Sequence, residues 1–590
     1  MYTYEKNLPR DSIRLLRITS DGERFSSTLE EFKLDRLPYF AAISWCWTSR
    51  RASRPRSFTC NAQEFPVSSH LYALLQNVTP RGVPASVTIW IDAICINQDH
   101  LEEKDVHIPR MSEIYSGAHF VLVWLGESQD DSDLVMDTQT VNHLNRNLVQ
   151  VPDFASPDYV TRDDLPSPKD PIWRAIGDLC DRNWFYRTWV VQEVALARKV
   201  NMLCGPRRLD WASLVTLINH LSRTGLSVRC RDPQAQPSSR PNGIGVLLEL
   251  HYVRKQHQEG GCPTDYILRA VRLKEVTKPI DKVYGIMGLL EKDMRNAITV
   301  NYAENEAQYW KIYMEVVKNI IATNNRSFWL LNMASSKERP EELPTWCPNL
   351  NSTIPEQLDF SYQPWCAGIL PVAQLNAGMF VRPDSSEIRT LGFVIDEVQD
   401  AVQLGSTRPD PNEKGGPSED SLISNFLAQD LRCLKLAQES YSREEEALEA
   451  YARTIVVNSW ANFSPILASE GEKVCQIYRD TVAYLSHRSV NAADAVSEGQ
   501  QEMHAYLRQL GWWAKRPFFK TKNGLIGRGP SNIHAGDLLC VFYGAGMAFV
   551  LRPRNGDLYG LVGDAYLHEC MELETLRPER RGLDVEFVIC

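Results

Sequence analysis

The stretch Ile89-Trp-Ile-Asp-Ala-Ile-Cys-Ile-Asn-Gln98 decides the fold of the first part of this chain. Its apolar residues predict a buried strand over 87–96 that runs into a loop at the polar Asn97 and Gln98. Asp92 is the carboxylate placed among these apolar neighbours. Because an unpaired buried charge is very costly, Asp92 must find hydrogen-bond donors or a ligand.

A second stretch, Arg187-Thr-Trp-Val-Val-Gln-Glu193, predicts a helix. Trp189 and Glu193 lie one helical turn apart in it, so that a large aromatic ring and a carboxylate share one face. Ligands of open α/β sheets bind beyond the carboxyl ends of the strands. Together the two stretches predict a site at such strand ends.

The composition is typical of a globular protein with more than one domain. The chain has 590 residues, of which 43% are hydrophobic and 23% charged, and its formal net charge is -10. This length divides into roughly two to four domains. Lys and Arg form no long block, which argues against nucleic acid as the main partner, since phosphate binding needs clustered cations.

The sequence shows no signal for secretion or for insertion into a membrane. Its start, Met1–Arg10, lacks the apolar stretch of a secretory signal, and no apolar run approaches the roughly 20 residues that span a bilayer. The 14 cysteines are scattered and form no pair of CxxC motifs. We therefore expect a cytoplasmic protein with reduced thiols, no membrane partner, and no bound metal or cofactor.

Apolar strands alternate with helical patterns in the first third of the chain. Tyr39–Trp45 and Phe120–Leu125 are continuous apolar runs of strand length. Residues 71–78 and 101–116 have helical spacing, with Pro109 as a kink in the second helix. Strands that are apolar on both faces indicate a parallel sheet covered by helices. We therefore predict an α/β fold with a parallel sheet.

The rest of the chain divides by its patterns into three further regions. Helical patterns dominate first, a mixed region with a Pro- and Gly-rich loop near 405–421 follows, and short strands separated by turns close the chain. The predicted domains are 1–215 (α/β), 216–330 (helical), 331–520 (mixed, mostly helical) and 521–590 (a small antiparallel β module).

Blocks of the first third resemble, in order, those of the fungal heterokaryon incompatibility (HET) domain. They are Tyr39-Phe-Ala-Ala-Ile-Ser-Trp-Cys-Trp47, Trp90-Ile-Asp-Ala-Ile-Cys-Ile-Asn-Gln98, Met111-Ser-Glu-Ile-Tyr-Ser-Gly-Ala118 with Val123-Trp-Leu-Gly126, and Arg187-Thr-Trp-Val-Val-Gln-Glu-Val-Ala-Leu-Ala197. Further pieces resemble full-length members: Asp281-Lys-Val-Tyr-Gly285, Leu343-Pro-Thr-Trp-Cys-Pro348 and pieces from Gly536 to Tyr566. The first block departs from the usual Trp-Gly ending, because Thr48 follows Trp47.

The resemblance implies a role in non-self recognition and regulated cell death. The HET domain is also remotely similar to Toll/interleukin-1 receptor (TIR) domains, some of which hydrolyse NAD with a Glu in a Trp-x-x-x-Glu helix. Trp189 and Glu193 match that pattern, which implies Glu193 as the candidate catalytic residue and NAD as the candidate substrate. The candidate contacts to such a ligand are Ser44, Trp45, Trp47, Asp92, Asn97, Gln98 and Trp189.

Glu193 has a functional and a structural interpretation. A carboxylate beside the ribose stabilises the oxocarbenium-like state in which the bond to nicotinamide breaks, while a tryptophan stacks on a ring of NAD. The structural alternative is an ion pair with Arg187 or Arg198. We favour the functional interpretation because of the place of Glu193 in the motif.

For Asp92 we favour a structural role, in which it accepts hydrogen bonds from Ser44 or from a helix N-terminus and organises the sheet. Asn97 and Gln98 fit a contact to a ligand and a cap of the following helix equally well. The residues alone leave these alternatives open.

Two classes of function remain. The first is an NAD-hydrolysing enzyme, which needs Glu193 at an open cleft with Trp45 or Trp47 nearby. The second is a non-enzymatic signalling scaffold that self-associates or binds a partner protein. A Glu193 buried in an ion pair, with no cavity beside it, would favour the scaffold.

Overall fold

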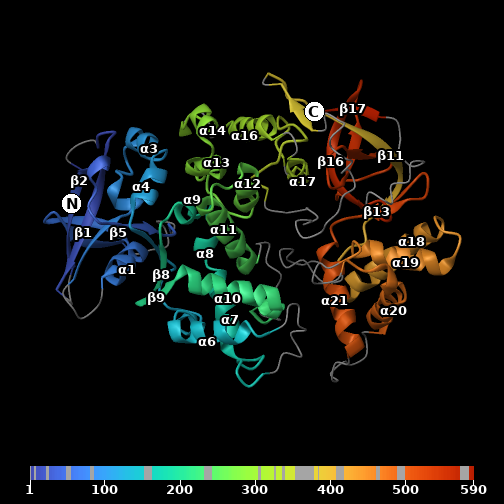
Figure 1. Ribbon diagram of the computed structural model, residues 1–590, viewed down its shortest axis with the longest axis horizontal. Helices are drawn as coiled ribbons and strands as arrows, with labels where there is room; N and C mark the ends of the chain where they lie inside the picture. The colour runs from blue at the N-terminus through green and yellow to red at the C-terminus, as the bar shows by residue number, and fades with distance from the viewer. Residues whose placement is uncertain are drawn as a thin grey trace. The chain divides into compact units, whose positions relative to one another are not determined.

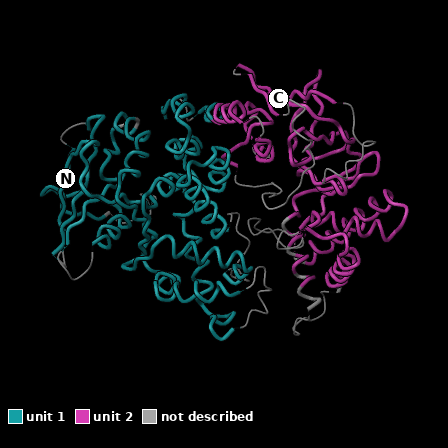
Figure 2. The backbone as a smooth tube through the Cα atoms, viewed as in Figure 1, with its two compact units in different colours: residues 1–236, 240–312 teal, residues 237–239, 313–590 magenta. Residues whose placement is uncertain are grey.

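The chain forms two compact units (Figure 2). Unit 1 holds residues 1–236 and 240–312, and unit 2 holds 313–590 with 237–239. The computed structural model describes the chain outside residues 1, 5–7, 22–24, 48–54, 80–84, 152–161, 231–241, 303–306, 325–326, 335–338, 353–377, 383, 407–417, 460–464, 488–497 and 572–583. Thr48 and most of the loop that we predict near 405–421 lie outside the described residues.

Unit 1 contains a mixed sheet (Figure 1). Its strands are β1 (Ser12–Ser20), β2 (Phe25–Lys33), β3 (Ala41–Ser44), β4 (Pro55–Cys60), β5 (Gln63–Ser68), β6 (Ala85–Trp90), β7 (Phe120–Trp124), β8 (Val200–Cys204) and β9 (Arg207–Asp210). They lie in the order β5-β4-β2-β1-β6-β3-β7-β8-β9. The run β6-β3-β7-β8 is parallel, which confirms the predicted parallel sheet, and antiparallel pairs flank it on both sides.

Of the parallel strands, β3 and β7 are buried, as their apolar sequences predict, whereas β6 is buried at Ile89 and Trp90 and more accessible before them. Every residue of β3 is buried, and β7 is buried from Val121 to Trp124. The helices of unit 1 are α1 (Ser69–Val78), α2 (Asp92–Cys95), α3 (Leu101–His107), α4 (Met111–Gly117), α5 (Ser132–Val135), α6 (Thr138–Leu148), α7 (Pro171–Cys180), α8 (Asn183–Tyr186), α9 (Val190–Ala195), α10 (Trp211–Thr224), α11 (Gly243–Gln258), α12 (Thr264–Arg272), α13 (Asp281–Tyr284) and α14 (Lys292–Ala297). Short 3-10 helices are η1 (Leu34–Arg36), η2 (Leu226–Cys230) and η3 (Met287–Leu289).

Two local predictions in this region are wrong in their bounds. The strand predicted over 87–96 ends at Trp90, because Asp92 starts the one-turn helix α2: its side chain accepts from the N–H of Ala93 at 2.8 Å, and its carbonyl accepts from the N–H of Ile96 at 3.2 Å. The helix predicted over 101–116 is divided into α3 and α4. The division falls at Pro109, which cannot donate a backbone hydrogen bond.

Unit 2 is built around a closed β-barrel. Its strands are β10 (Met379–Val381), β11 (Ile388–Val402), β12 (Phe518–Thr521), β13 (Ile526–Arg528), β14 (Leu538–Phe542), β15 (Ala548–Pro553), β16 (Leu558–Leu567) and β17 (Asp584–Ile589). They follow the order β10-β11-β12-β13-β16-β15-β14. Because β11 pairs with both β12 and β14, the sheet closes on itself. The barrel thus takes β11 from a region that the sequence patterns mark as mostly helical.

The helices of unit 2 pack a second apolar core against the barrel. Ala450, Tyr451 and Ile455 of one helix share this core with Phe518 and Ile526 of the barrel strands. The helices are α16 (Tyr309–Thr323), which begins at the end of unit 1, α17 (Trp329–Met333), α18 (Glu419–Gln438), α19 (Glu444–Ile455), α20 (Gly471–His487) and α21 (Glu498–Trp512), with a 3-10 turn η5 (Ala468–Glu470). None of the helices in the described part of the chain has the length and apolar character to cross a bilayer.

Candidate functional site

The parallel arrangement of β3 and β6 brings the first group of candidate residues to one edge of the sheet. Ala42 pairs with Trp90 in this register, so that the residues just after each strand, Trp45 and Asp92, leave the sheet side by side. This is the carboxyl-end position where α/β sheets bind their ligands. Hydrogen bonds between side chains join the two blocks at this edge.

Asp92 is held by two tryptophans. The indole N–H of Trp45 donates to Oδ1 at 2.8 Å, and that of Trp47 donates to Oδ2 at 2.9 Å. The backbone N–H of Ala93 also donates to Oδ1 at 2.8 Å. Of the two partners that we expect for Asp92, the helix N-terminus is therefore right and Ser44 is wrong. The paired donors satisfy the carboxylate at this half-buried position.

The two tryptophans differ in their exposure to solvent. Trp45 is buried at 4%, whereas 41% of Trp47 is exposed. Their ring centroids lie 5.6 Å apart, and the ring of Trp45 also stacks on His70 at 6.0 Å. The exposed face of Trp47 thus marks the part of this edge that a binding partner can reach without any movement of the protein.

Glu193 lies behind this edge and is buried, with an exposed fraction of 3%. Ser44, the last residue of β3, donates its hydroxyl hydrogen bond to Oε2 of Glu193. Trp184 holds Ser44 in turn, because its indole N–H donates to the Ser44 hydroxyl oxygen at 2.8 Å. The Tyr115 hydroxyl of α4 lies close enough to act on Glu193 as well, and it donates to the backbone carbonyl of Ile43 at 3.3 Å. Glu193 is thus enclosed by protein donors.

The two arginines that we expect to pair with Glu193, Arg187 and Arg198, donate to different backbone carbonyls. Arg187 donates to the backbone carbonyl of Trp45, and its charge acts on Glu193 electrostatically. Arg198 instead donates to the carbonyl of Ser116 at 3.1 Å. For Arg187 the structural alternative therefore holds in part, because its positive charge acts on Glu193. The predicted ion pair between Glu193 and Arg198 is wrong.

The pKa of Glu193 is raised from 4.5 to about 7. Burial is the largest cause, because it penalises the ionised carboxylate, and the nearby charge of Asp92 acts in the same direction. The charge of Arg187, the hydrogen bond from Ser44 and the nearby Tyr115 hydroxyl oppose the rise without cancelling it. Glu193 is consequently close to half ionised at neutral pH.

The remaining candidates have partners within the protein. The Trp189 side chain hydrogen-bonds the carboxylate of Asp281. Asn97 accepts from the N–H of Asp99 at 3.2 Å, and the amide of Gln98 donates to the carbonyl of Asp92 at 2.8 Å. These contacts organise the turn between α2 and α3, although the cap of α3 itself is His100.

Sequence reasoning missed Tyr115 and Trp184 as partners of the Ser44–Glu193 pair. Both lie in or beside the blocks that carry the resemblance, since Tyr115 falls within 111–118 and Trp184 just precedes 187–197. The available signal was a polar-tipped aromatic residue in an apolar block. Such residues usually find a hydrogen-bond partner when they are buried.

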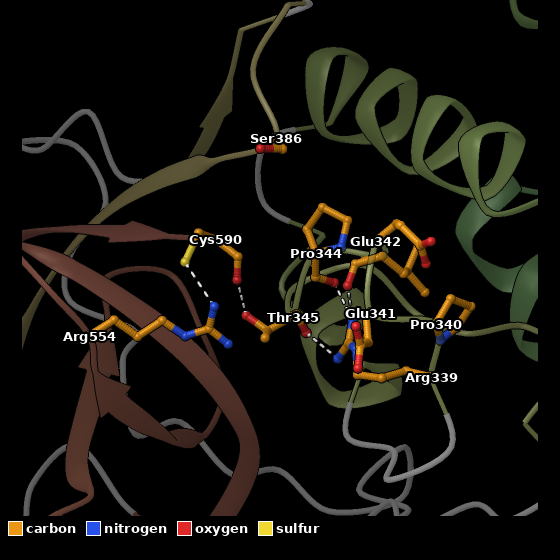
Figure 3. Close-up of a pocket in the computed structure, with 10 residues that line it drawn as sticks. Arg339, Pro340, Glu341, Glu342, Pro344, Thr345, Ser386, Arg554 and Cys590 are labelled. Atoms are coloured by element: carbon orange, nitrogen blue, oxygen red, sulfur yellow. Dashed lines mark hydrogen bonds between the residues drawn. The ribbon is translucent and has the colours of Figure 1, made fainter.

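A pocket of about 450 Å³ lies elsewhere, in unit 2 (Figure 3). Its arginines are engaged locally: Arg339 donates to the carbonyls of Leu343 and Thr345 at 3.1 Å each, and Arg554 donates to the sulfur of Cys590 at 3.5 Å. The pocket contains none of the candidate residues. Within the described residues, no group of three or more His, Cys, Asp or Glu side chains is placed to hold a metal ion.

Comparison with known proteins gives consistent matches at both ends of the chain. Residues 40–193 match the family described as Heterokaryon incompatibility protein (HET), and residues 432–585 match the Het-6 beta-barrel domain. The chain is 24% identical over 582 residues to "Heterokaryon incompatibility protein 6, OR allele" of Neurospora crassa, an alignment that covers 84% of this chain and 82% of that protein. No solved structure gives a significant match.

Proposed function

We propose that this chain, a HET-domain protein homologous over most of its length to heterokaryon incompatibility protein 6 of Neurospora crassa, acts in non-self recognition that triggers regulated cell death. The observation that carries the proposal is the alignment over 84% of the chain. Two separate stretches of the chain match the HET family and the Het-6 beta-barrel domain. The relative is named for heterokaryon incompatibility, and we propose this same role for the present chain.

The burial of Glu193 favours a non-enzymatic mechanism for the HET domain. A carboxylate that stabilises a reacting ribose must touch it, and Glu193 is 3% exposed and bonded to Ser44. Trp47, a large aromatic residue at the same edge, does reach solvent. Exposed tryptophans are common anchors of protein interfaces. The domain therefore acts by self-association or by binding a partner protein.

Hydrolysis of NAD is the second candidate mechanism, and the environment of Glu193 favours it. A pKa raised to about 7 and a position at strand ends are both typical of catalytic carboxylates. In this reaction the ribosyl–nicotinamide bond breaks with its electron pair leaving on nicotinamide. Water then adds to the ribosyl carbon, and ADP-ribose and a proton are released. For this reaction, Glu193 would first have to lose its hydrogen bond from Ser44 and accept one from a ribose hydroxyl instead.

The two mechanisms are separated by a nicotinamide-release assay on the purified full-length protein. We expect no release from the wild type, even at concentrations at which light scattering shows self-association. Expression in fungal cells of a different incompatibility genotype should nevertheless reduce the survival of fused cells. Survival equal to that of empty-vector fusions would contradict the proposed role in non-self recognition.

Variants at two glutamates control the assay. Glu193→Gln removes the buried carboxylate, and Glu102→Gln changes an exposed glutamate in the first turn of α3. Release of nicotinamide by the wild type and by Glu102→Gln, but not by Glu193→Gln, would establish NAD hydrolysis in place of the scaffold. Equal release by all three proteins would establish hydrolysis and exclude Glu193 from it.

A further inference from the structure

The helix that carries Glu193, α9, is contacted by a later segment of unit 1 that runs from α11 to η3. Arg254 of α11 donates to the carbonyl of Ala197 at 2.6 Å, just after the end of α9. The Asp281 carboxylate of α13 bonds Trp189 at its start. Between them, the backbone N–H of Gly288 in η3 donates to the side-chain Oε1 of Gln192 at 2.6 Å. The segment from α11 to η3 thus contacts α9 along its whole length.

Gly288 leaves no room for a side chain. A Cβ built on it would lie 2.3 Å from the Cβ of Ser112 and 2.7 Å from Oε1 of Gln192. Real Cβ atoms do not approach other heavy atoms this closely, so that a neighbour would have to move. Ser112 belongs to α4 and Gln192 to α9. The glycine is therefore fitted against both helices at once.

These two helices carry the partners of the buried network. Tyr115 lies one turn after Ser112 on α4, and Glu193 directly follows Gln192 on α9. Space for a Cβ at Gly288 opens if η3 moves off the two helices or if one helix is displaced relative to the other. Displacement of a helix would lengthen the contact between Tyr115 and Glu193, or draw Glu193 away from Ser44 on β3.

We infer that Gly288 is a positioning residue for Glu193: the absence of a side chain at this point of η3 sets the spacing of α4 and α9 that keeps the Glu193 carboxylate enclosed by Ser44 and Tyr115. In treating this network as functional, the inference rests on the function proposed above. The residues that contact α9 from the later segment, Arg254, Asp281 and Gly288, lie beyond residue 193, where the match to the HET family ends.

The test is the titration of the Glu193 carboxyl in the full-length protein. The infrared band of the protonated carboxyl is isolated as the difference between each protein and the same protein carrying Glu193→Gln. Gly288→Ala is compared with Gly245→Ala, because Gly245 lies in α11 with no heavy atom within 4 Å of a built Cβ. The titratable or charged groups that act on Glu193 are Tyr115, Arg187 and Asp92, and none of them is changed.

We expect the midpoint for Glu193 to fall by at least one pH unit in Gly288→Ala, toward the value of an exposed carboxyl, and to stay unchanged in Gly245→Ala. A second substitution that removes the closer of the two clashing atoms, Ser112→Gly in the Gly288→Ala background, should restore the midpoint. An unchanged midpoint in folded Gly288→Ala overturns the inference. A lowered midpoint that Ser112→Gly leaves lowered also overturns it.

If Gly288→Ala does not fold, Gln192→Leu takes its place. This variant removes the oxygen that accepts from Gly288 and keeps a side chain of similar size. Its midpoint should fall in the same direction, and an unchanged midpoint would again overturn the inference. The titration needs neither NAD hydrolysis nor cell death, so that the inference and the proposed function can fail separately.

Discussion

At the scale of single residues, two carboxylates at one edge of the sheet differ in burial and in the type of their hydrogen-bond donors. Asp92 stays half-buried and receives N–H donors from Trp45, Trp47 and Ala93. Glu193 is buried and receives a hydroxyl donor from Ser44. Burial disfavours the ionised form of Glu193 and raises its pKa.

The raised pKa of Glu193 predicts how stability depends on pH. Because the pKa is higher in the folded protein, about 7 against 4.5, the favourable contribution is fully present below 4.5 and is lost as pH rises through 7. Relative to Glu193→Gln, the wild type should lose on the order of 3 kcal/mol of unfolding free energy across this window. Urea denaturation of both proteins between pH 4.5 and 8 measures the difference.

The comparison uses glutamine because it keeps the shape of glutamic acid and cannot ionise. Glu102→Gln, which changes an exposed side chain in the same way, is the matched control. A flat difference for Glu193→Gln would mean that Glu193 is already ionised in the folded protein at pH 5.

At the scale of elements, α9 depends on its neighbours. The helix has six residues, and a helix this short is not stable by itself in water. Its last carbonyls need donors from outside, and Arg254 supplies them to Val194 and Ala197. The cation also lies at the negative end of the helix dipole. One long side chain from α11 therefore fixes the end of the helix next to Glu193.

Arg254→Met should loosen α9 while it keeps most of the packing of the long side chain. We expect a loss of about 2 to 3 kcal/mol, because charged hydrogen bonds to buried carbonyls are removed and the carbonyls are left unpaired. Hydrogen exchange of the amides in 190–197 should become faster. Lys255→Met is the matched control, since the neighbouring Lys255 pairs only with Glu259 at the surface. Equal protection of 190–197 in both variants would argue against the role of Arg254.

The sequence predicts the elements of this site better than the contacts between them. The strands around Trp45 and Asp92 are apolar runs, and parallel strands necessarily bring their ends together. The helix α2 escaped prediction because a single turn has no periodicity to detect. The pair Ser44–Glu193 spans 149 residues, and the position of Glu193 depends on Arg254 and later residues. No local pattern encodes such a distance.

At the scale of the whole molecule, the chain has two compact units that each contain a sheet and helices. In unit 2, a joint of buried polar groups around Asp537 adds to the apolar core of the barrel. Asp537, fully buried, accepts from Arg552 at 2.8 and 2.9 Å and from the backbone N–H of His534 at 3.0 Å. The joint ties the start of β14 to β15, two pieces in which the sequence resembles the HET-protein family.

Separate cores predict separate unfolding. Calorimetry of the full chain should show two transitions, and Asp537→Ala should lower one of them by on the order of 5 °C, because it leaves Arg552 and the N–H of His534 without their acceptor, at about 2 kcal/mol. Asp557→Ala, which changes an exposed aspartate in the turn between β15 and β16, should move neither. Arg254→Met should lower the other transition, since Arg254 belongs to unit 1. A single transition that moves in both Asp537→Ala and Arg254→Met would show instead that the two units unfold as one.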